Sequence, residues 1–364
     1  MVIDLRELNS SIISENGNLM RVIKQFVTII IGALLLLNSV LSYAEKNSTD
    51  LNYIVKKNDT VWGICKTYVS DPLCWKKLVE YNQLKNPKYL PPRSVIRIPK
   101  SWLIDHPTTA LVIAVEGQVS VTHKDTTEQK VLVVGDRLNQ QDIVQALNGT
   151  AMIQFADQSR LLLKANSTIR METLQFYDPS QLVNTRVELL KGRVKAQVKK
   201  ISNKNSRYEI VTPAAVAAVR GTDFRVGNDL DNQGNTVMRT ELLTGKLDVA
   251  SDTNMQSINA GQAIMAIEGK GVSDPVNLLP RPLMEINGAR SFQLPHDIQW
   301  FPIKGAVSYK VSLMTDSSQL WEMSTDKPSF TLQDLDSGSF EFLIRGVDAQ
   351  GFEGRNRHLK INLP

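Results

Sequence analysis

Two cysteines and four histidines are the residues of this 364-residue chain best suited to redox, metal or nucleophilic chemistry. Cys65 and Cys74 are nine positions apart, which suits one disulfide in an oxidising compartment. The alternative is a pair of buried thiols that pack as small hydrophobic side chains. The histidines are scattered and have no partners at metal-ligand spacing: His106, His123, His296 and His358. The sequence therefore predicts no metal site, no cofactor and no Cys–His catalytic pair, and we expect a protein that is not an enzyme.

Residues 1–44 have the pattern of an export signal. A basic start, Met20–Lys24, precedes the apolar run Phe26–Leu37, and Ser42-Tyr43-Ala44 matches the small-x-small sequence that a signal peptidase cuts after. Even extended to Leu41, the run reaches only 16 residues, and a membrane-spanning helix needs about 20. We therefore expect a signal peptide cleaved after Ala44, with an uncleaved anchor as the alternative. The expected location is the periplasm or cell envelope.

The net charge limits which partners are expected, and the aromatic content divides the remaining chain into regions. The formal net charge of +5 is too weak an excess to indicate nucleic-acid binding, although it suits an anionic envelope surface. Aromatic residues are frequent in 51–100 and 293–364 but rare in 110–270. A proline-containing linker, 273–292, separates the last two regions and is expected to be stiff and irregular. The fold class predicted is multidomain and mainly β.

The first region predicts a small module with the order strand, helix, helix, strand. Alternating apolar residues predict strands at Tyr53–Val55 and Val95–Ile98. Between them, apolar residues at i, i+3, i+4 and i+7 predict a helix over Val61–Tyr68. Asp71-Pro72 predicts the start of a second helix, because proline is tolerated in a first turn. A disulfide would join the two helices and compensate for the small core.

This module resembles the LysM domain. The residues that carry the resemblance are Tyr53-x-Val55, Asp59-Thr60-Val61-Trp62-x-Ile64, Trp75, Leu78, Asn82 and Leu90-Pro91-Pro92-x-x-Val95-x-Ile98-Pro99. The chain departs from the family at Asn58 and Pro92, where glycine is usual. Asparagine tolerates a left-handed backbone next best after glycine.

The resemblance implies binding of chains that contain N-acetylglucosamine, chiefly peptidoglycan and chitin, in a shallow groove between two loops. The residues that would line it are Asn58, Asp59, Thr60 and Val61 on one side and Asn86, Pro87, Lys88 and Tyr89 on the other. Backbone amides and the carboxylate would hydrogen-bond the acetamido groups. The alternatives are that Asp59 and Thr60 only cap the helix and that Tyr89 only packs. Trp62 and Trp75 are expected in the core, because both lie on predicted helices.

Residues 110–270 predict an all-β domain, either a sandwich or a β-helical roll. Glycine turns followed by period-2 alternation recur at unequal spacings, which argues against a fixed-period array: Glu116–Val121, Val134–Leu138, Lys191–Ala196, Thr244–Val249 and Ala260–Ile264. Within this region the stretch Thr212–Phe224 is distinctive. With Phe155-x-Asp157-x-Ser159-x-Leu161 and Glu188-Leu189-x-x-Gly192-x-Val194, it resembles the FecR domain. Gln158 stands where that family usually has glycine.

The FecR family includes periplasmic segments of regulators that relay a signal from an outer-membrane receptor. Arg220 and Asp223 would either pair across a turn and recognise a partner, or satisfy local backbone groups while Val219 and Phe224 enter the core. About 20 residues precede the apolar run near the start, too few for a folded cytoplasmic domain. The resemblance therefore implies the fold more strongly than direct signalling.

Residues 293–364 resemble a fibronectin type III-like sandwich. The resemblance rests on Gln299–Leu313, with Trp300 expected in the core, and on the alternation of Phe340, Phe342 and Ile344. Such sandwiches usually serve as spacers or protein-contact modules.

Together these features predict a non-catalytic envelope protein that binds peptidoglycan through its first module. The β domains would be scaffold or partner-contact modules, with an envelope protein as a possible partner. One alternative is a periplasmic signal-relay component, and another is a cell-wall hydrolase or its accessory.

Overall fold

The computed structural model describes residues 50–363 except 72, 105, 178–181, 201–205, 220, 232, 285–289, 292–293, 316–317 and 334. The expected signal peptide and Arg220 lie outside the described residues. Within them the chain is mainly β with two α-helices, so the predicted fold class is confirmed. No helix among these residues is long and apolar enough to cross a membrane.

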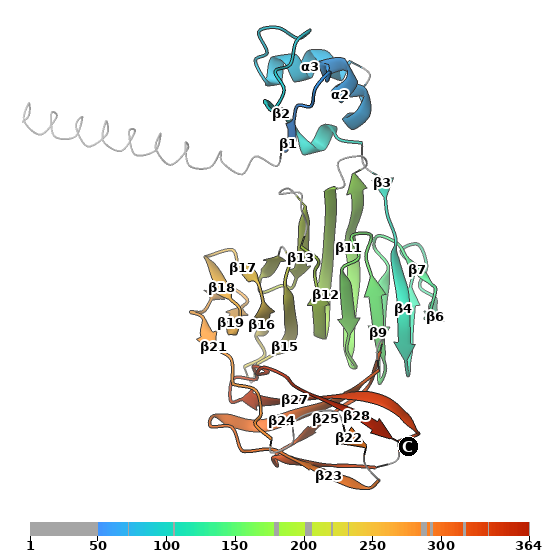
Figure 1. The fold of residues 1–364 in the computed structure, drawn as a ribbon, viewed down its shortest axis with the longest axis vertical. Helices are drawn as coiled ribbons and strands as arrows, with labels where there is room; N and C mark the ends of the chain where they lie inside the picture. Colours follow the sequence, from blue (N-terminus) through green and yellow to red (C-terminus); the bar gives the residue numbers. More distant parts are fainter. Residues whose placement is uncertain are drawn as a thin grey trace, which may run out of the picture. The chain divides into compact units, whose positions relative to one another are not determined.

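The N-terminal module contains a two-stranded sheet and two helices (Figure 1). Strand β1 (Leu51–Ile54) pairs antiparallel with β2 (Val95–Ile98), and η1 (Lys100–Trp102) follows. Helices α2 (Val61–Tyr68) and α3 (Cys74–Tyr81) occupy the chain between the strands. All four regular elements contribute side chains that are at most 5% exposed: Leu51, Val61, Ile64, Leu78, Ile96 and Ile98. The predicted order of elements is therefore correct.

A disulfide joins Cys65 in α2 to Cys74, the first residue of α3, with the two Cα atoms 5.7 Å apart. This finding decides between the two interpretations of the cysteines in favour of the bridge. The bridge fixes the second helix to the first across a short connection. It also compensates for the small apolar core of a module of this size.

The expectation that both tryptophans enter the core is wrong. Trp62 is 60% exposed and Trp75 is 37% exposed. Helix α2 buries the stripe that begins at Val61, and the next residue is rotated by about 100° away from it. Helix α3 likewise buries Cys74 and Leu78, which leaves Trp75 beside the buried face.

The FecR-like region forms nineteen strands among the described residues. They are β3 (His106–Pro107), β4 (Ala110–Glu116), β5 (Val119–Thr122), β6 (Gln129–Val131), β7 (Arg137–Leu138), β8 (Ile143–Ala146), β9 (Thr150–Gln154), β10 (Arg160–Leu163), β11 (Ser167–Tyr177), β12 (Leu182–Gln197), β13 (Arg207–Val211), β14 (Val216–Val219), β15 (Asp223–Leu230), β16 (Thr236–Thr244), β17 (Lys246–Ala250), β18 (Met255–Asn259), β19 (Gln262–Ile267), β20 (Gly271–Val272) and β21 (Val276–Asn277).

These strands form two sheets whose ladders close into one barrel-like network. One sheet has the order β6–β5–β8–β11–β12–β13–β14–β17–β18, and β3 also pairs with β11. The other has the order β7–β4–β9–β10–β12–β15–β16–β19, with β20 and β21 both paired to β19. Only β12 and β13 run parallel among these pairs. Buried side chains from both sheets form one continuous apolar core.

Strand β12 passes from one sheet to the other at Gly192. Up to Lys191 it pairs with β11, and from Gly192 onward it pairs with β15. Gly192 has φ +84°, and a Cβ there would lie 2.5 Å from the carbonyl oxygen of Asn166. Glycine is therefore required at this point of the FecR-like motif. Gln158, in contrast, adopts φ +67° without being glycine.

The C-terminal region has a five-stranded sheet and a two-stranded sheet (Figure 1). The larger has the order β22 (Arg290–Ser291), β28 (Arg357–Leu363), β27 (Gly338–Asp348), β24 (Ala306–Met314), β25 (Gln319–Thr325). The smaller pairs β23 (His296–Gln299) with β26 (Ser329–Leu332). Trp300 is buried and meets Tyr309 edge-on, with ring centroids 5.3 Å apart. The sheets share one core, as expected for a sandwich.

The expected linker 273–292 is partly ordered against the FecR-like sheet. Its residues Val276–Asn277 form β21, and the Leu278 amide donates to the Gly261 carbonyl at 2.8 Å. Leu278 and Phe352, from the C-terminal region, lie in one apolar cluster with Ala263 of β19. The linker therefore helps to fasten the two β regions together.

Candidate functional site

Asp59 holds the first predicted binding loop in place. Its Oδ2 atom accepts hydrogen bonds from the Tyr53 hydroxyl at 2.7 Å and from the Lys56 amide at 2.6 Å. Neither of these two bonds caps a helix, so the carboxylate shapes the loop before α2. Thr60 is exposed and directly precedes the helix, which is the N-cap position.

The other two residues predicted on this side differ in accessibility. Asn58 is exposed and adopts φ +71°, the left-handed conformation expected where the family has glycine. Val61 is only 3% exposed and belongs to the core of the module. Asn58 and Thr60 are therefore more accessible to a glycan than Val61.

The second predicted loop is exposed throughout and is shaped by Asn86. The Asn86 side-chain oxygen accepts from the Lys88 amide at 3.0 Å, and its carbonyl accepts from the Tyr89 amide at 3.3 Å. This local turn leaves the Tyr89 side chain 64% exposed. Pro87 and Lys88 are exposed beside it. The alternative in which Tyr89 serves only to pack does not fit this exposure.

Antiparallel pairing places both loops at the same end of the small sheet. The first loop leaves the end of β1 and the second enters the start of β2. The pairing continues past the strands, because Val55 donates to the Ser94 carbonyl and Arg93 donates to the Val55 carbonyl, each at 2.8 Å. The strand ends thus hold the start of one loop beside the end of the other.

Asn82 anchors the start of the second loop to β2. Its amide nitrogen donates to the carbonyls of Leu78 at 3.0 Å and Arg97 at 2.8 Å, and its oxygen accepts from the Arg97 amide at 2.7 Å. One side chain therefore ends α3 and fixes the helix against the strand. This geometry explains why asparagine suits this position of the motif.

Two exposed apolar residues near these loops were missed by sequence reasoning. Ile54 and Val95 are register partners at the loop end of the sheet and are 62% and 51% exposed. Together they form an exposed apolar surface beside the two loops. The signal in the sequence was the alternation itself, which directs alternate residues of each strand away from the core.

A buried ionic cluster joins the FecR-like and C-terminal regions. Its members are Lys164, Arg193, Arg225 and Glu241 from the first region and Lys310, Glu322, Arg345 and Glu353 from the second. Arg225 and Arg345 have side chains only 2% exposed, and those of Glu241 and Glu353 are fully buried. With five basic and three acidic groups, the cluster has a formal excess of two positive charges. We call it the seam cluster.

Glu353 lies at the centre of the seam cluster. From the FecR-like side, Arg193 Nε and Arg225 Nη1 approach its carboxylate at 3.2 and 3.3 Å. From its own region, Arg345 and Lys310 pair with the same carboxylate. The backbone also takes part, because Arg225 Nη2 donates to the carbonyls of Glu353 and Gly354, both at 2.7 Å.

The charges of the seam cluster shift the pKa values of its members. Burial alone would raise the pKa of Glu353, but the positive charges of Arg193, Arg345 and Lys164 hold it well below its ordinary value. Burial lowers the pKa of Lys164 to about 8, against the opposing influence of Glu353 and Glu322. The Glu353 carboxylate is thus ionised at neutral pH.

The FecR-like motif supplies residues to both the core and this interface. Val219 and Phe224 are buried, as the second interpretation of the motif expected. Asp223 Oδ2 lies 3.6 Å from Lys195 Nζ, and its amide donates to Thr244 Oγ1 at 3.0 Å. Arg220 is outside the described residues, so its pairing with Asp223 stays a prediction. Arg225, two positions after Asp223, was not singled out by the sequence.

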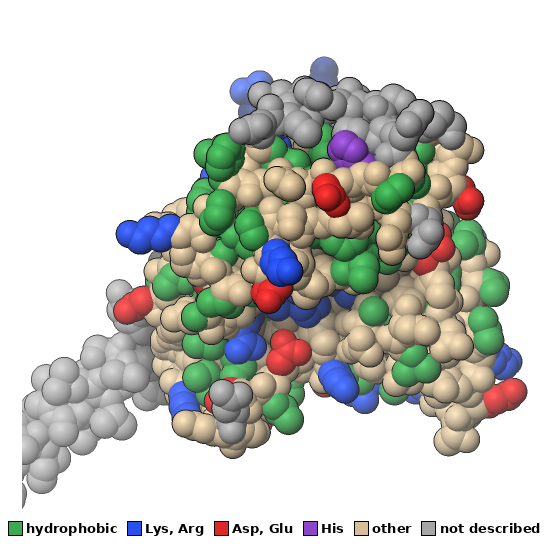
Figure 2. Space-filling view, turned by 90° about the horizontal axis from the view of Figure 1, so that it is seen from below, with side chains coloured by type: hydrophobic (Ala, Val, Ile, Leu, Met, Phe, Trp, Pro, Cys, Tyr) green, Lys and Arg blue, Asp and Glu red, His purple; other side chains and the backbone are tan. Residues whose placement is uncertain are grey.

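Figure 2 shows basic and acidic side chains interspersed with apolar ones on the face that it draws. This agrees with the small net charge of +5.

Comparison with family models identifies two parts of the chain. Residues 53–99 match the LysM domain, and residues 141–248 match the FecR protein family. The chain carries a LysM domain followed by a FecR domain. Both resemblances inferred from the sequence are therefore confirmed, and that of residues 293–364 to fibronectin type III stays a prediction. No curated protein matches the chain.

Similar solved structures are distant. One is a "putative anti-sigma factor" from Parabacteroides distasonis ATCC 8503, with 17% identity, a TM-score of 0.31, and coverage of 37% of this chain and 59% of the other. Another is the extracellular domain of a "putative hybrid two component system" from B. thetaiotaomicron, with 8% identity, a TM-score of 0.18, and coverage of 75% and 61%. The chain thus spans less than two thirds of either structure.

Proposed function

We propose that this is a non-catalytic protein of the cell envelope that binds peptidoglycan through its LysM domain. The observation that carries the proposal is the match to LysM together with two loops at one end of the sheet, one of them presenting Tyr89 at 64% exposure. LysM domains bind glycans that contain N-acetylglucosamine. Peptidoglycan is the glycan of this class that an exported envelope protein would meet.

The contacts proposed for the glycan follow from which groups are free to reach it. Asn58 and Tyr89 are exposed and offer an amide and an aromatic ring with a hydroxyl. Ile54 and Val95 offer apolar cover for the acetamido methyl groups. Asp59 would act as a positioning residue, because its carboxylate already accepts two hydrogen bonds within the loop.

Co-sedimentation of the purified chain with isolated sacculi tests this function. We expect Tyr89→Ala and Asn58→Ala each to weaken binding about tenfold, whereas Glu80→Ala, an exposed change on α3, leaves it unchanged. Retained binding in both loop variants, or no binding of the unaltered chain, would refute the groove. Clearing of a sacculus suspension would refute the non-catalytic part of the proposal.

A second candidate function is signal relay, which the FecR match over residues 141–248 favours. In this role the FecR and C-terminal regions would contact an envelope protein while the LysM domain keeps the protein at the wall. A deletion strain tests it through its transcriptional response to envelope stress. An unaltered response would count against relay and would leave the wall-binding proposal standing.

A further inference from the structure

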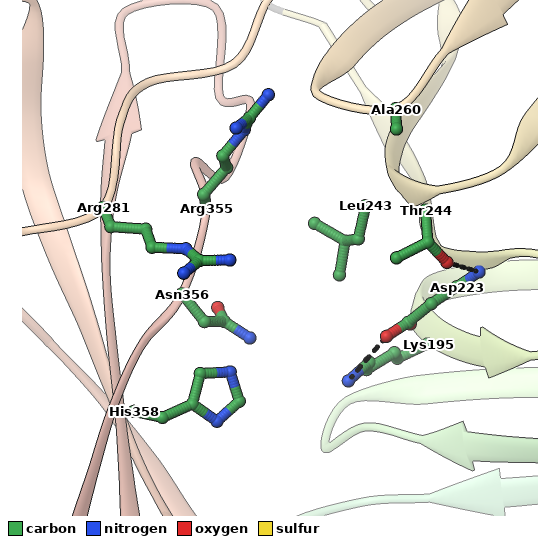
Figure 3. A pocket seen from close by; sticks show the side chains of 9 residues that line it. All are labelled: Lys195, Asp223, Leu243, Thr244, Ala260, Arg281, Arg355, Asn356 and His358. Carbon is green, nitrogen blue, oxygen red and sulfur yellow. Dashed lines mark hydrogen bonds and ion pairs between the residues drawn. The ribbon is translucent and has the colours of Figure 1, made fainter.

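A pocket of about 270 Å³ lies between the FecR domain, the linker and the C-terminal region (Figure 3). Its polar lining comes from all three parts: Lys195 and Asp223 from the FecR domain, Arg281 from the linker, and Arg355, Asn356 and His358 from the C-terminal region. The pocket is separate from the LysM loops. The FecR motif contributes Asp223, but neither proposed function uses the pocket.

The lining has more positive than negative charge. Among the lining residues that the structure describes, Asp223 is the one acidic residue, and its Oδ2 atom lies 3.6 Å from Lys195 Nζ. Within the part of the chain that the structure describes, neither Arg281 nor Arg355 has a hydrogen bond or ion pair from its guanidinium group. Two guanidinium groups without counter-charges favour an anion.

Hydrogen-bond donors from opposite walls face the same space. Figure 3 shows Arg281 and Asn356 reaching in from one wall above the His358 ring, with Lys195 and Asp223 on the other wall. Arg355 extends away from these groups and lies against Gly261, whose φ of +87° is a conformation that residues with a side chain rarely adopt. A planar guanidinium group binds carboxylate and phosphate oxygens in pairs.

We infer that this pocket binds a small oxyanion with two negative charges, held between Arg281 on the linker and Lys195 on the FecR domain. Its volume suits a small molecule or a single charged group. Counted over Lys195, Arg281, Arg355 and Asp223, the lining has a net charge of +2, which the two negative charges would balance. Arg355 points away from the facing groups, so it would act only through its longer-range field. A phosphate group and a dicarboxylate share this chemistry.

Binding of such an anion would favour the association of the FecR domain with the C-terminal region. Its contacts would come from both regions, so it would favour the state in which they are docked. The site would thus give the FecR domain and the C-terminal region a way to respond to a small molecule.

Isothermal titration calorimetry of the purified chain tests the inference, with phosphate and succinate as separate ligands at ionic strength fixed by sodium chloride. We expect at least one to bind at concentrations below about 10 mM, and the preferred ligand distinguishes phosphate from dicarboxylate. Arg281→Gln should weaken that binding at least tenfold and Arg355→Gln a few-fold. Arg160→Gln, which removes an exposed arginine of β10, should change it less than twofold.

The inference is overturned if neither anion binds, or if Arg281→Gln binds as the unaltered chain does. Arg281 and Arg355 are exposed, so their substitution is expected to leave the fold intact. The thermal unfolding of each variant without ligand checks this. Binding of sacculi by the same variants should be unchanged, which separates this test from that of the LysM loops.

Discussion

The LysM domain and the seam cluster hold their parts together by different means. The LysM domain has a small apolar core, a disulfide between Cys65 and Cys74, and binding candidates left in exposed loops. The seam cluster instead brings together five basic and three acidic side chains between two β regions, and those of Arg225, Arg345, Glu241 and Glu353 are at most 2% exposed. A covalent bridge limits the unfolded chain whatever its surroundings. A buried ionic cluster depends on every partner being present.

Among the changes considered, loss of the Glu353 carboxylate should lower the free energy of unfolding most. Glu353→Gln removes a negative charge and leaves Arg193, Arg225 and Arg345 with less compensation in a buried site. We expect the free energy of unfolding of the two β regions to fall by about 3–5 kcal/mol. Denaturant unfolding followed by far-ultraviolet circular dichroism, to which the many strands of the two β regions contribute most, measures it.

Glu341→Gln is the matched control for that change. It removes a surface carboxylate that lies 3.1 Å from His358 Nδ1, and an exposed polar pair of this kind contributes about 0–1 kcal/mol. Equal destabilisation by the two variants would show that burial of the seam cluster does not set its contribution. The seam cluster would then not stabilise the two β regions more than an exposed pair does.

The sequence predicted the LysM domain better than it predicted the seam cluster. Helix α2 has the bounds that apolar spacing indicated, and Asn58 has the left-handed backbone expected of it. Helix bounds and backbone conformation depend on residues only a few positions apart in the sequence, so the sequence can predict them. Trp62 was misplaced because a position on a helix does not by itself tell which face is buried.

The seam cluster could not be predicted because its partners are distant in sequence. Arg225 and Glu353 are separated by 128 positions, and Glu241 and Glu353 by 112. Alternation along β15 places Asp223 and Arg225 on one side of the strand, but it does not tell what lies opposite them. The lining of the anion pocket likewise comes from three parts of the chain that only the fold brings together.

The pH dependence of stability should show the contribution of Lys164. Its pKa is lowered from 10.5 to about 8 in the folded protein, so between these values the unfolded chain binds more protons than the folded one. Stability from this group should therefore rise with pH across that window, by up to about 3 kcal/mol. Urea unfolding at pH 7.5, 9 and 10, compared between the unaltered chain and Lys164→Met, isolates this contribution.

In Lys164→Met the rise that depends on this lysine is absent, so the difference in unfolding free energy between the two proteins should change with pH in favour of the unaltered chain. Well below pH 8 the difference should be constant, because Lys164 is then protonated in both the folded and the unfolded state. A difference that does not vary between pH 8 and 10 would contradict the burial of a charged lysine in the seam cluster.

The disulfide should have a smaller effect, confined to the LysM domain. Cys65→Ser with Cys74→Ser removes a bridge across a sequence separation of 9, and closure of a loop of about ten residues stabilises by about 2–3 kcal/mol. Hydrogen exchange should therefore become faster in residues 51–102 while the seam cluster strands β12, β15 and β27 keep their protection. Reduction of the unaltered chain is a matched control, because these are its only two cysteines. Equally faster exchange in β12 and β15 would show that the disulfide stabilises more than the LysM domain. The LysM domain and the seam cluster would then not be stabilised independently.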